Sequence, residues 1–394
     1  MGCKWNQEPL REFVSDLFKG VVPIYIDEGH EYAVPVIGQR CVRNYEIDLS
    51  PIRFHNGFSK PIPIRKMLRK HDILINATGV GSAGRVAQIR DDIRATIDGH
   101  VIVVRAKKID PMYLGYALKC QQSKIEQLAE GSTGQTEMNK QRLQDEIIIS
   151  YPNSIVDQLK IVHILNSIDR QIVFLNQVNG HLSECIHAIY RNFANEVQVG
   201  NNGHEGTISE LLEVRYGKDH KKLANGTIPV YGSGGLMRHV DRSLYQGESV
   251  LVPRKGSLDH VMYVNESFWT VDTMFYTVPR MIGAAKYAYE YLLEQNLAAM
   301  NAGSAVPSMT TRILNAIPVF IPPESALNNF DSITEVFFKS LRRNFNEIDA
   351  LAQLRDALLP KLMSGEIDVS KVELPMPPAQ TPTSANGRLP ELDS

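Results

Sequence analysis

Hydrophobic positions in the first part of the chain fall in short runs of β-type residues that are broken by turn residues, a pattern that predicts β-strands. The strands are expected at residues 34–37, 72–76, 85–89 and 100–105. A longer stretch, 111–130, has apolar residues at helical spacing and predicts a helix whose apolar face consists of Leu114, Leu118, Ile125 and Leu128. The same order returns later, with strands expected at 227–231, 249–252, 260–264 and 274–278 and a helix at 282–300. The pattern in each half therefore predicts an α+β module with a mixed or antiparallel sheet.

Each module is followed by a longer helical pattern with a coiled-coil seam. In residues 151–200, apolar side chains recur at heptad spacing, with Asn179 as the one polar position, and the seam residues are Ile168, Ile172, Leu175, Leu182, Ile186 and Ile189. In residues 323–367 the seam residues are Leu341, Phe345, Ile348, Leu351, Leu358 and Leu362. Pro360 lies within the last turns of the second pattern, so we expect it to kink that helix or end it early.

Neither long helix can bury its seam alone. A helix of roughly 40 residues is about 60 Å long. We therefore expect the two helices to pack against each other, antiparallel, because one globular module lies between them in the chain.

The two modules are also related in sequence. Thr96-Ile97-Asp98 reappears as Thr270-Val271-Asp272, a separation of 174 residues (270 minus 96), and Tyr113 and Tyr287 keep the same separation. A long unit that occurs twice indicates a tandem domain duplication rather than a solenoid. We therefore expect an α+β fold in which two repeated globular modules, related by an approximate two-fold axis, are separated by two long antiparallel coiled-coil helices. The expected segments are a first module at 1–150, a long helix at 151–200, a second module at 201–322, a long helix at 323–367 and a disordered tail at 368–394.

Composition places the chain among ordinary soluble globular proteins. It has 394 residues, of which 43% are apolar and 22% charged. No apolar run approaches the ~18 residues of a membrane span, and the first residues lack the apolar segment of a signal peptide, so we expect a cytoplasmic protein without a membrane partner. The 4 Cys have no paired spacing and predict neither a zinc site nor a disulfide framework.

Charge adds one local feature. The net charge of −2 argues against a protein that holds polyanions by bulk charge alone. Between residues 53 and 71, however, there is a run without any acid that contains Arg53, Lys60, Arg65, Lys66, Arg69 and Lys70. Such a basic run is either a solvated loop or a phosphate-contacting surface, and the run alone leaves both interpretations open.

A glycine-rich segment invites a cofactor interpretation. Gly79-Val80-Gly81-Ser82-Ala83-Gly84 has the G-x-G-x-x-G spacing of a dinucleotide-binding loop. That loop must open a helix, whereas residues 85–89 alternate like a strand. We therefore interpret the segment as the tip of a hairpin, and Arg254-Lys255-Gly256-Ser257 as the matching turn of the second half. Another stretch, 231–235, is either a flexible turn or a loop that approaches a phosphate or a groove.

Catalytic motifs are missing from the sequence. We find no G-x-S-x-G, no H-E-x-x-H and no Pro-Pro-aromatic motif of an amino-methyltransferase. Asp98 and Asp272 are the most conspicuous paired acids of the repeat. Each follows a β-branched residue and precedes a strand, so we interpret both as turn residues that accept hydrogen bonds from backbone donors. We expect no catalytic residue, no metal and no cofactor on this chain.

With these features the chain resembles the specificity subunit of type I restriction-modification enzymes. The resemblance covers about residues 5–370. It is carried by the doubled architecture, by Asp72-Ile73-Leu74-Ile75-Asn76 with Thr78-Gly79 in the first module, by Val252-Pro253-Arg254-Lys255-Gly256-Ser257 in the second, and most specifically by Leu358-Leu359-Pro360-Lys361-Leu362-Met363-Ser364-Gly365-Glu366-Ile367.

The resemblance implies a non-catalytic DNA-binding subunit of a phage-defence system. In that family each module is a target recognition domain that binds one half of a split, asymmetric sequence of double-stranded DNA, and the helix pair fixes the gap between the halves. The helices also dock two copies of an adenine methyltransferase subunit, which carries S-adenosylmethionine. The restriction and translocase subunit, which uses ATP and Mg, joins that core.

The expected DNA contacts divide into two kinds. The basic run would contact phosphates and position the modules, while hairpin and turn tips would read base edges. Candidates for readout in the first module are Gln39, Arg40, Lys60, Thr78 and Arg85. In the second they are Lys218, Lys221, Ser233, Arg238, Arg254 and Lys255. The alternatives are a nucleotide-binding enzyme, a scaffold that docks partners without reading DNA, and the DNA-reading subunit of another phage-defence methylation system.

Overall fold

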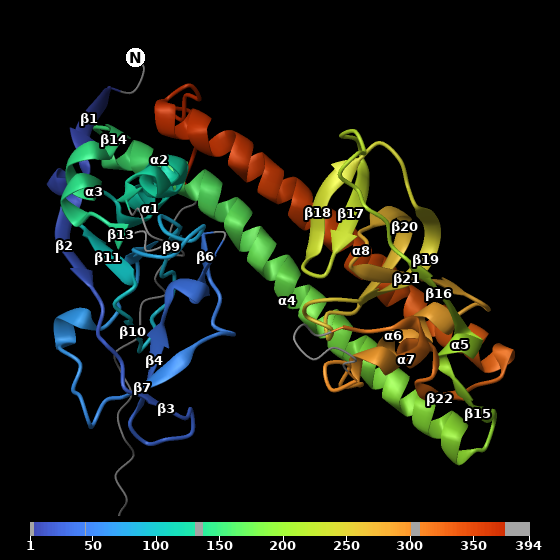
Figure 1. Cartoon of the computed structure of the whole chain (residues 1–394). Helices are drawn as coiled ribbons and strands as arrows, with labels where there is room; N and C mark the ends of the chain where they lie inside the picture. The colour runs from blue at the N-terminus through green and yellow to red at the C-terminus, as the bar shows by residue number, and fades with distance from the viewer. Residues whose placement is uncertain (1–3, 44, 131–136, 301–307, 375–394) are drawn as a thin grey trace, which may run out of the picture. The chain divides into compact units, whose positions relative to one another are not determined.

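The computed structural model describes residues 4–43, 45–130, 137–300 and 308–374, and it divides into two compact units (Figure 1). The first unit is Met1–Ile172 with Asp349–Ser394, and the second is Val173–Ile348. Each unit contains one α+β module together with part of each of two long helices, α4 (Ile155–Val199) and α8 (Glu324–Ser364).

The first module is built on two four-stranded sheets. One sheet is antiparallel and has the strand order β2 (Val14–Lys19), β11 (Val101–Ala106), β8 (Ile73–Asn76), β9 (Val86–Gln88). The other has the order β10 (Thr96–Ile97), β4 (Ala33–Ile37), β7 (Arg53–Asn56), β3 (Tyr25–Ile26), and its β10–β4 pair is parallel. Three smaller pairs complete it: β1 (Trp5–Pro9) with β14 (Ile148–Pro152), β5 (Val42–Arg43) with β6 (Glu46–Ile47), and β12 (Ala129–Glu130) with β13 (Glu137–Met138).

The helices of the first module are short. The single helix predicted at 111–130 is in fact two, α1 (Pro111–Cys120) and α2 (Gln122–Gln127), because Gln121 between them leaves the helical conformation. Asp110 caps α1 by accepting a hydrogen bond from the Tyr113 amide, and Pro111 follows at the first helical position. The remaining elements are α3 (Lys140–Glu146) and the 3₁₀ turns η1 (Leu10–Phe13), η2 (Gln39–Cys41) and η3 (Ile64–Lys66).

The second module has one six-stranded sheet. Its order is β16 (Leu212–Tyr216), β21 (Met274–Pro279), β19 (Tyr245–Pro253), β20 (Met262–Thr270), β17 (Ile228–Gly232), β18 (Gly235–Val240), and β17 and β20 are parallel. A separate pair joins β15 (His204–Thr207) to β22 (Pro318–Ile321). The helices are α5 (Ile208–Leu211), α6 (Ala284–Leu293) and α7 (Thr311–Asn315). The predicted mixed α+β architecture is therefore confirmed in both modules.

The central strands of both modules are buried on both faces. In β8, Ile73 and Ile75 belong to the core that includes side chains of the long helices, whereas Leu74 belongs to a second core on the other face. In β19 the same division separates Val250 and Val252 from Leu251. Burial on both faces explains why these strands read as continuous apolar runs in the sequence.

Matching contacts confirm the duplication. The Tyr113 hydroxyl donates to the Ser150 carbonyl at 2.8 Å, and the Tyr287 hydroxyl donates to the Phe320 carbonyl at 3.0 Å, so each module ties its main helix to its last strand in the same way.

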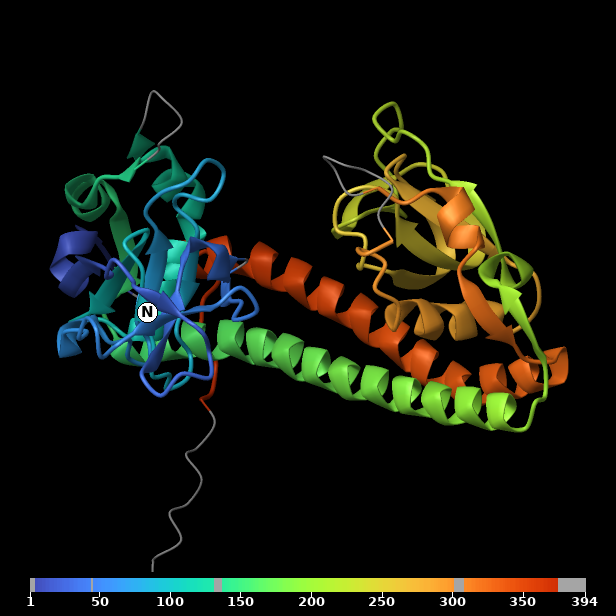
Figure 2. The same cartoon turned by 60° about the horizontal axis from the view of Figure 1, so that its bottom comes forward.

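The two long helices pair antiparallel within each unit (Figure 2). In the second unit Phe193 of α4 stacks on Phe330 of α8 at 4.9 Å, and further along the pair the Asn344 amide donates to the Asn179 side-chain oxygen at 2.8 Å. Most of the predicted seam is covered. Buried are Ile172, Leu175, Ile186 and Leu362, and half-buried are Ile168, Leu182, Ile189, Leu341, Ile348, Leu351 and Leu358.

The structure corrects two expectations about α8: the seam position of Phe345, and the early end of the helix that was one of the two alternatives for Pro360. Phe345 is 57% exposed, because the polar pair between Asn179 and its neighbour Asn344 takes the inward position. Pro360 does not end the helix, which continues to Ser364 and stops before Gly365 with its φ of +78°. The adjacent Leu359 and Leu362 are buried in the core of the first unit, and burying such side chains offsets the cost of about 3 kcal/mol of a proline inside a helix.

The prediction of a disordered tail is wrong for its first residues, 368–374. Val369 is 2% exposed in the core of the first unit, and the Lys160 ammonium donates to the Ser370 carbonyl at 2.8 Å. Residues 368–374 are therefore part of the folded unit. Residues 375–394 of the predicted tail lie outside the described residues.

Candidate functional site

The glycine-rich segment of the first module is the turn of a β-hairpin. Strands β8 and β9 pair antiparallel on either side of it, with Ile75 opposite Val86. Gly79, Gly81 and Gly84 have φ values of +100°, +71° and +86°, which side chains other than glycine adopt rarely. Because a strand and not a helix follows the third glycine, the dinucleotide-binding alternative lacks the helix N-terminus that it requires. The hairpin interpretation is confirmed.

This turn gathers three of the predicted readout residues. The Thr78 hydroxyl donates to the Gln39 side-chain oxygen at 3.2 Å and lies 2.8 Å from the His100 Nδ1. The Arg85 guanidinium donates to the Gly81 carbonyl at 2.7 Å, inside the same turn. Sequence reasoning missed His100, whose only signal was its position two residues after Asp98.

The basic run divides into side chains that are held and side chains that are free. The ammonium groups of Lys60 and Lys66 donate to the carbonyls of Val22 and Gly20, at 2.9 and 2.8 Å. The Arg53 guanidinium lies 3.8 Å from the centre of the Tyr25 ring. Among the described residues, the exposed side chains of Arg69 and Lys70 make no hydrogen bond or ion pair.

A buried ion pair fixes the backbone of this basic loop. Arg105 and Asp72 are 7% and 3% exposed and form a bidentate pair at 2.9 and 3.0 Å. The same guanidinium also donates to the carbonyls of Arg65 and Met67, at 2.8 and 2.7 Å. The loop is thus anchored from inside, and its cationic side chains are presented on a fixed backbone.

The corresponding turn of the second module carries a different set of side chains. Arg254 donates to the Asp272 carbonyl at 3.1 Å and lies over the Tyr216 ring at 5.1 Å, while Lys255 is exposed. Gly256 has a φ of +89°, matching Gly79 in conformation. The tips of the two modules therefore share a backbone feature and differ in their chemistry.

The other predicted residues of the second module lie in the β17–β18 hairpin and on the loop after β16. The Ser233 carbonyl is 2.6 Å from the His260 Nδ1, and the Arg238 guanidinium donates to the Leu223 carbonyl at 2.6 Å. Lys218 and Lys221 are exposed on the loop that follows β16. In the first module, Arg40 is likewise exposed.

The two paired aspartates have different environments. Asp98 is 4% exposed, accepts a hydrogen bond from the His100 amide at 2.8 Å, and has its pKa raised by burial. The turn interpretation is confirmed for it. Asp272 also lies in a turn, but the hydrogen-bonding role predicted for it is wrong: the side chain is exposed and makes no hydrogen bond or ion pair within the described residues. The Met274 amide donates instead to the Val271 carbonyl.

Asp272 lines an open hollow of about 410 Å³. The hollow also contacts His220, from the loop after β16, and Ser233 and Met237, from the turn and the second strand of the β17–β18 hairpin. The His220 Nδ1 is buried and has no hydrogen-bond partner in the described part of the chain.

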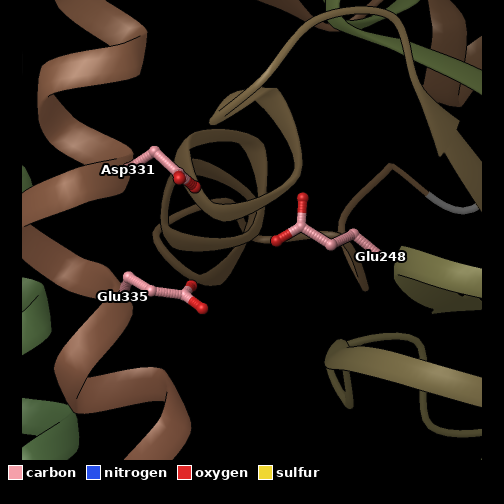
Figure 3. Close-up of side chains that lie close together, drawn as sticks. All are labelled: Glu248, Asp331 and Glu335. Atoms are coloured by element: carbon pink, nitrogen blue, oxygen red, sulfur yellow. The ribbon is translucent and has the colours of Figure 1, made fainter.

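One cluster of carboxylates has the spacing of a cation site. Glu248 of β19 and Asp331 and Glu335 of α8 point toward one another (Figure 3). The cluster is already occupied, because the Lys286 ammonium donates to Asp331 at 2.8 Å and also to Glu335. Burial disfavours the charge on Lys286, but the hydrogen bonds to the carboxylates prevail and raise its pKa. The arrangement is an internal ion cluster that joins α6 to α8 rather than a metal centre.

A second buried network joins the first module to both long helices. Asp169 of α4, 7% exposed, accepts hydrogen bonds from Arg90 at 2.5 Å and from the Tyr116 hydroxyl of α1 at 2.6 Å. Arg355 of α8 donates to the other carboxylate oxygen at 3.2 Å. Burial acts against ionisation, but the charge of Arg90 and the Tyr116 hydrogen bond lower the pKa of Asp169 overall. Sequence reasoning missed this network, since Asp169 stands beside the seam residue Ile168.

Within the described residues, no helix is long and apolar enough to cross a membrane.

The chain matches one family model twice, in agreement with its two modules. Residues 65–183 and 204–344 match the family model described as the type I restriction modification DNA specificity domain. The chain is similar to the type I restriction enzyme MjaIX specificity subunit of Methanocaldococcus jannaschii, with 33% identity over 70 residues, which are 18% of this chain and 16% of that protein. It is also similar to the putative type I restriction enzyme specificity subunit S.HindORF215P of Haemophilus influenzae, with 27% identity over 105 residues, 26% of this chain and 27% of that protein.

These sequence matches span about a quarter or less of each relative. The structural similarity extends over more of the chain than these sequence matches do. A crystal structure of the S subunit of the type I restriction-modification system of M. genitalium aligns over 91% of this chain and 96% of its own, with a TM-score of 0.57 and 18% identity.

Proposed function

Since the chain belongs to the family of the type I restriction modification DNA specificity domain, which matches it twice, we propose that it reads a bipartite DNA target. Each module binds one half of the target, and the two halves differ in sequence. The observation that carries this proposal is the duplication with diverged tips: a left-handed glycine stands at Gly79 and at Gly256, but Gln39 and Thr78 surround the first and Ser233 and Lys255 adjoin the second. Two related modules whose tips carry different side chains suit an asymmetric target.

Contacts to phosphates and to bases come from different parts of each module. Free cationic side chains on an anchored loop, such as Arg69 and Lys70, neutralise phosphates and position the module on the duplex. Base edges are read by side chains of the turn tips, which present donors and acceptors in defined directions. In the first module these are Gln39, Thr78 and His100.

The long helices set the separation of the two half-sites and dock the partners. Most of their predicted seam is covered, yet Val173, Phe174 and Phe345 in the second unit are 45%, 57% and 57% exposed. Exposed apolar side chains on a helix pair favour protein contacts. We assign this surface to methyltransferase subunits, two copies of which would carry S-adenosylmethionine. Methylation, and cleavage driven by ATP and Mg on a restriction subunit, then take place on the partners.

The decisive experiment is methylation mapping by long-read sequencing in a host that expresses this chain with its neighbouring methyltransferase subunit. The expected result is a split motif with methyladenine in both halves. Exchanging residues 205–320 for those of another family member should change one half of the motif and leave the other half and the gap intact. A stable complex that methylates nothing would instead indicate a scaffold, and methylation of an unsplit motif would indicate another kind of DNA-reading system.

A further inference from the structure

The β17–β18 hairpin exposes two large apolar side chains side by side. Leu236 and Met237 are 48% and 55% exposed. In the strand pairing Val230 faces Arg238 whereas Tyr231 faces Leu236, so Met237 is the extra residue of a β-bulge. In a regular strand adjacent side chains point to opposite faces, and a bulge is the usual device that redirects one of them.

Gly232 leaves room for the Met237 side chain because it has no Cβ. A Cβ on Gly232 would lie 2.5 Å from the Met237 sulfur, so the thioether folds directly over this glycine. Met237 thereby becomes one wall of the hollow that Asp272 and His220 also line. A hairpin residue that is exposed, redirected and seated over a glycine belongs to a formed surface rather than to a core.

Asp272 supplies the polar part of that surface. Its carboxylate is exposed and unpaired among the described residues, whereas its duplicate Asp98 is buried and caps a turn. In the second module, the acid at this position therefore does not make the turn hydrogen bond that Asp98 makes in the first. Its position is also unfavourable for phosphates, which a carboxylate repels.

The loop beside the hollow is basic on balance, with three lysines and one acid, Asp219. The loop that supplies His220 also carries Lys218, Lys221 and Lys222, all of them exposed. Lysines on this loop suit the DNA backbone, and an unpaired acid in the hollow that the loop adjoins suits a group that donates hydrogen bonds. The only such donors in the major groove are the amino groups of cytosine and adenine.

We propose that Asp272 and Met237 form a specificity pocket for a cytosine in the half-site bound by the second module, a proposal that rests on the function proposed above. Asp272 accepts a hydrogen bond from the cytosine N4 amino group, and Met237 covers the neighbouring apolar C5 edge. Adenine fits less well, because its amino group stands beside the N7 acceptor, which repels a carboxylate. Guanine and thymine present acceptors, O6 and O4, where Asp272 needs a donor.

The test is methylation mapping of three variants beside the wild-type chain. Asp272→Asn keeps the size of the side chain and adds a donor, and since asparagine pairs with adenine N6 and N7, one specified cytosine should become a position that also accepts adenine. Preference for cytosine there should fall roughly ten-fold. Met237→Ala should weaken preference at the same position. Asp241→Asn, which removes an equal charge from an exposed residue after β18, should leave the motif unchanged.

The outcomes separate this proposal from the broader one. If the wild-type chain gives a split motif and Asp272→Asn gives the same motif, the pocket is refuted and the bipartite reader stands. A change at a position that is adenine in the wild-type motif also overturns the assignment to cytosine. If the wild-type complex yields no split motif, the proposed function fails first and takes the pocket with it.

Discussion

Replacing Asp169 by alanine should destabilise the first unit by about 3 kcal/mol. The carboxylate holds Arg90, Tyr116 and Arg355, which come from a loop after β9, from α1 and from α8. Removing one partner of a buried ion pair typically costs about 3–5 kcal/mol, because the remaining charge stays buried without compensation. We expect the lower end, since Arg355 keeps its pair with the exposed Asp356 at 2.9 Å.

Hydrogen exchange of the full chain, followed by mass spectrometry, measures this effect in each unit separately. A loss of about 3 kcal/mol should speed exchange through unit opening by roughly two orders of magnitude in α1 and in residues 155–172. The matched control is Asp349→Ala, an exposed acid of the same unit whose one hydrogen bond among the described residues comes from Gln353. Its expected cost is below about 0.5 kcal/mol.

The pH dependence follows from the direction of the Asp169 pKa, which is lowered from 3.8. A lowered pKa in the folded state means that the stabilisation is present above about pH 4 and is lost as the pH falls through the folded value. The difference between wild type and Asp169→Ala should therefore shrink in acid. The reasoning is refuted if Asp169→Ala costs no more than Asp349→Ala at neutral pH.

Three further predictions concern other positions. Asn179→Leu should lower the free energy of unfolding measured in urea by about 1–3 kcal/mol, because it leaves Asn344 buried without its partner. Replacing both residues by leucine should lower it less than the single change, and equal losses would refute an interaction between the two side chains. Lys119→Met should stabilise the chain by up to about 3 kcal/mol at pH 7, because burial of the charged ammonium group lowers the lysine pKa from 10.5 to about 8. The cost of burying that charge disappears as the pH rises from 8 to 10.5, so the gain in stability should vanish in alkali. A gain that does not change with pH would contradict this prediction. Arg69→Gln with Lys70→Gln should reduce the salt-dependence slope of DNA binding by the assembled complex by about 0.9 for each phosphate that is no longer neutralised, on all sequences alike, and an unchanged slope would remove these residues from the interface.

The sequence by itself determined the architecture of this protein. The spacing of apolar residues predicted the modules and the helix pair, and the strand pattern after Gly84 correctly favoured a hairpin over a cofactor loop. These features depend on local periodicity and on the backbone preferences of single residues, which can be read from the sequence without knowledge of the fold.

Only the tertiary structure decided which polar residues are free. Asp98 and Asp272 occupy the same place in the repeat, yet one is buried in a turn and the other is exposed at a hollow. The amide two residues later donates to the Asp98 carboxylate in the first module and to the Val271 carbonyl in the second. Lys66 and Lys70 lie in one basic run, but only Lys66 is held by a carbonyl, that of Gly20. Whether a charge is available to a ligand depends on which distant groups the fold brings within hydrogen-bonding distance, and no local pattern records those interactions.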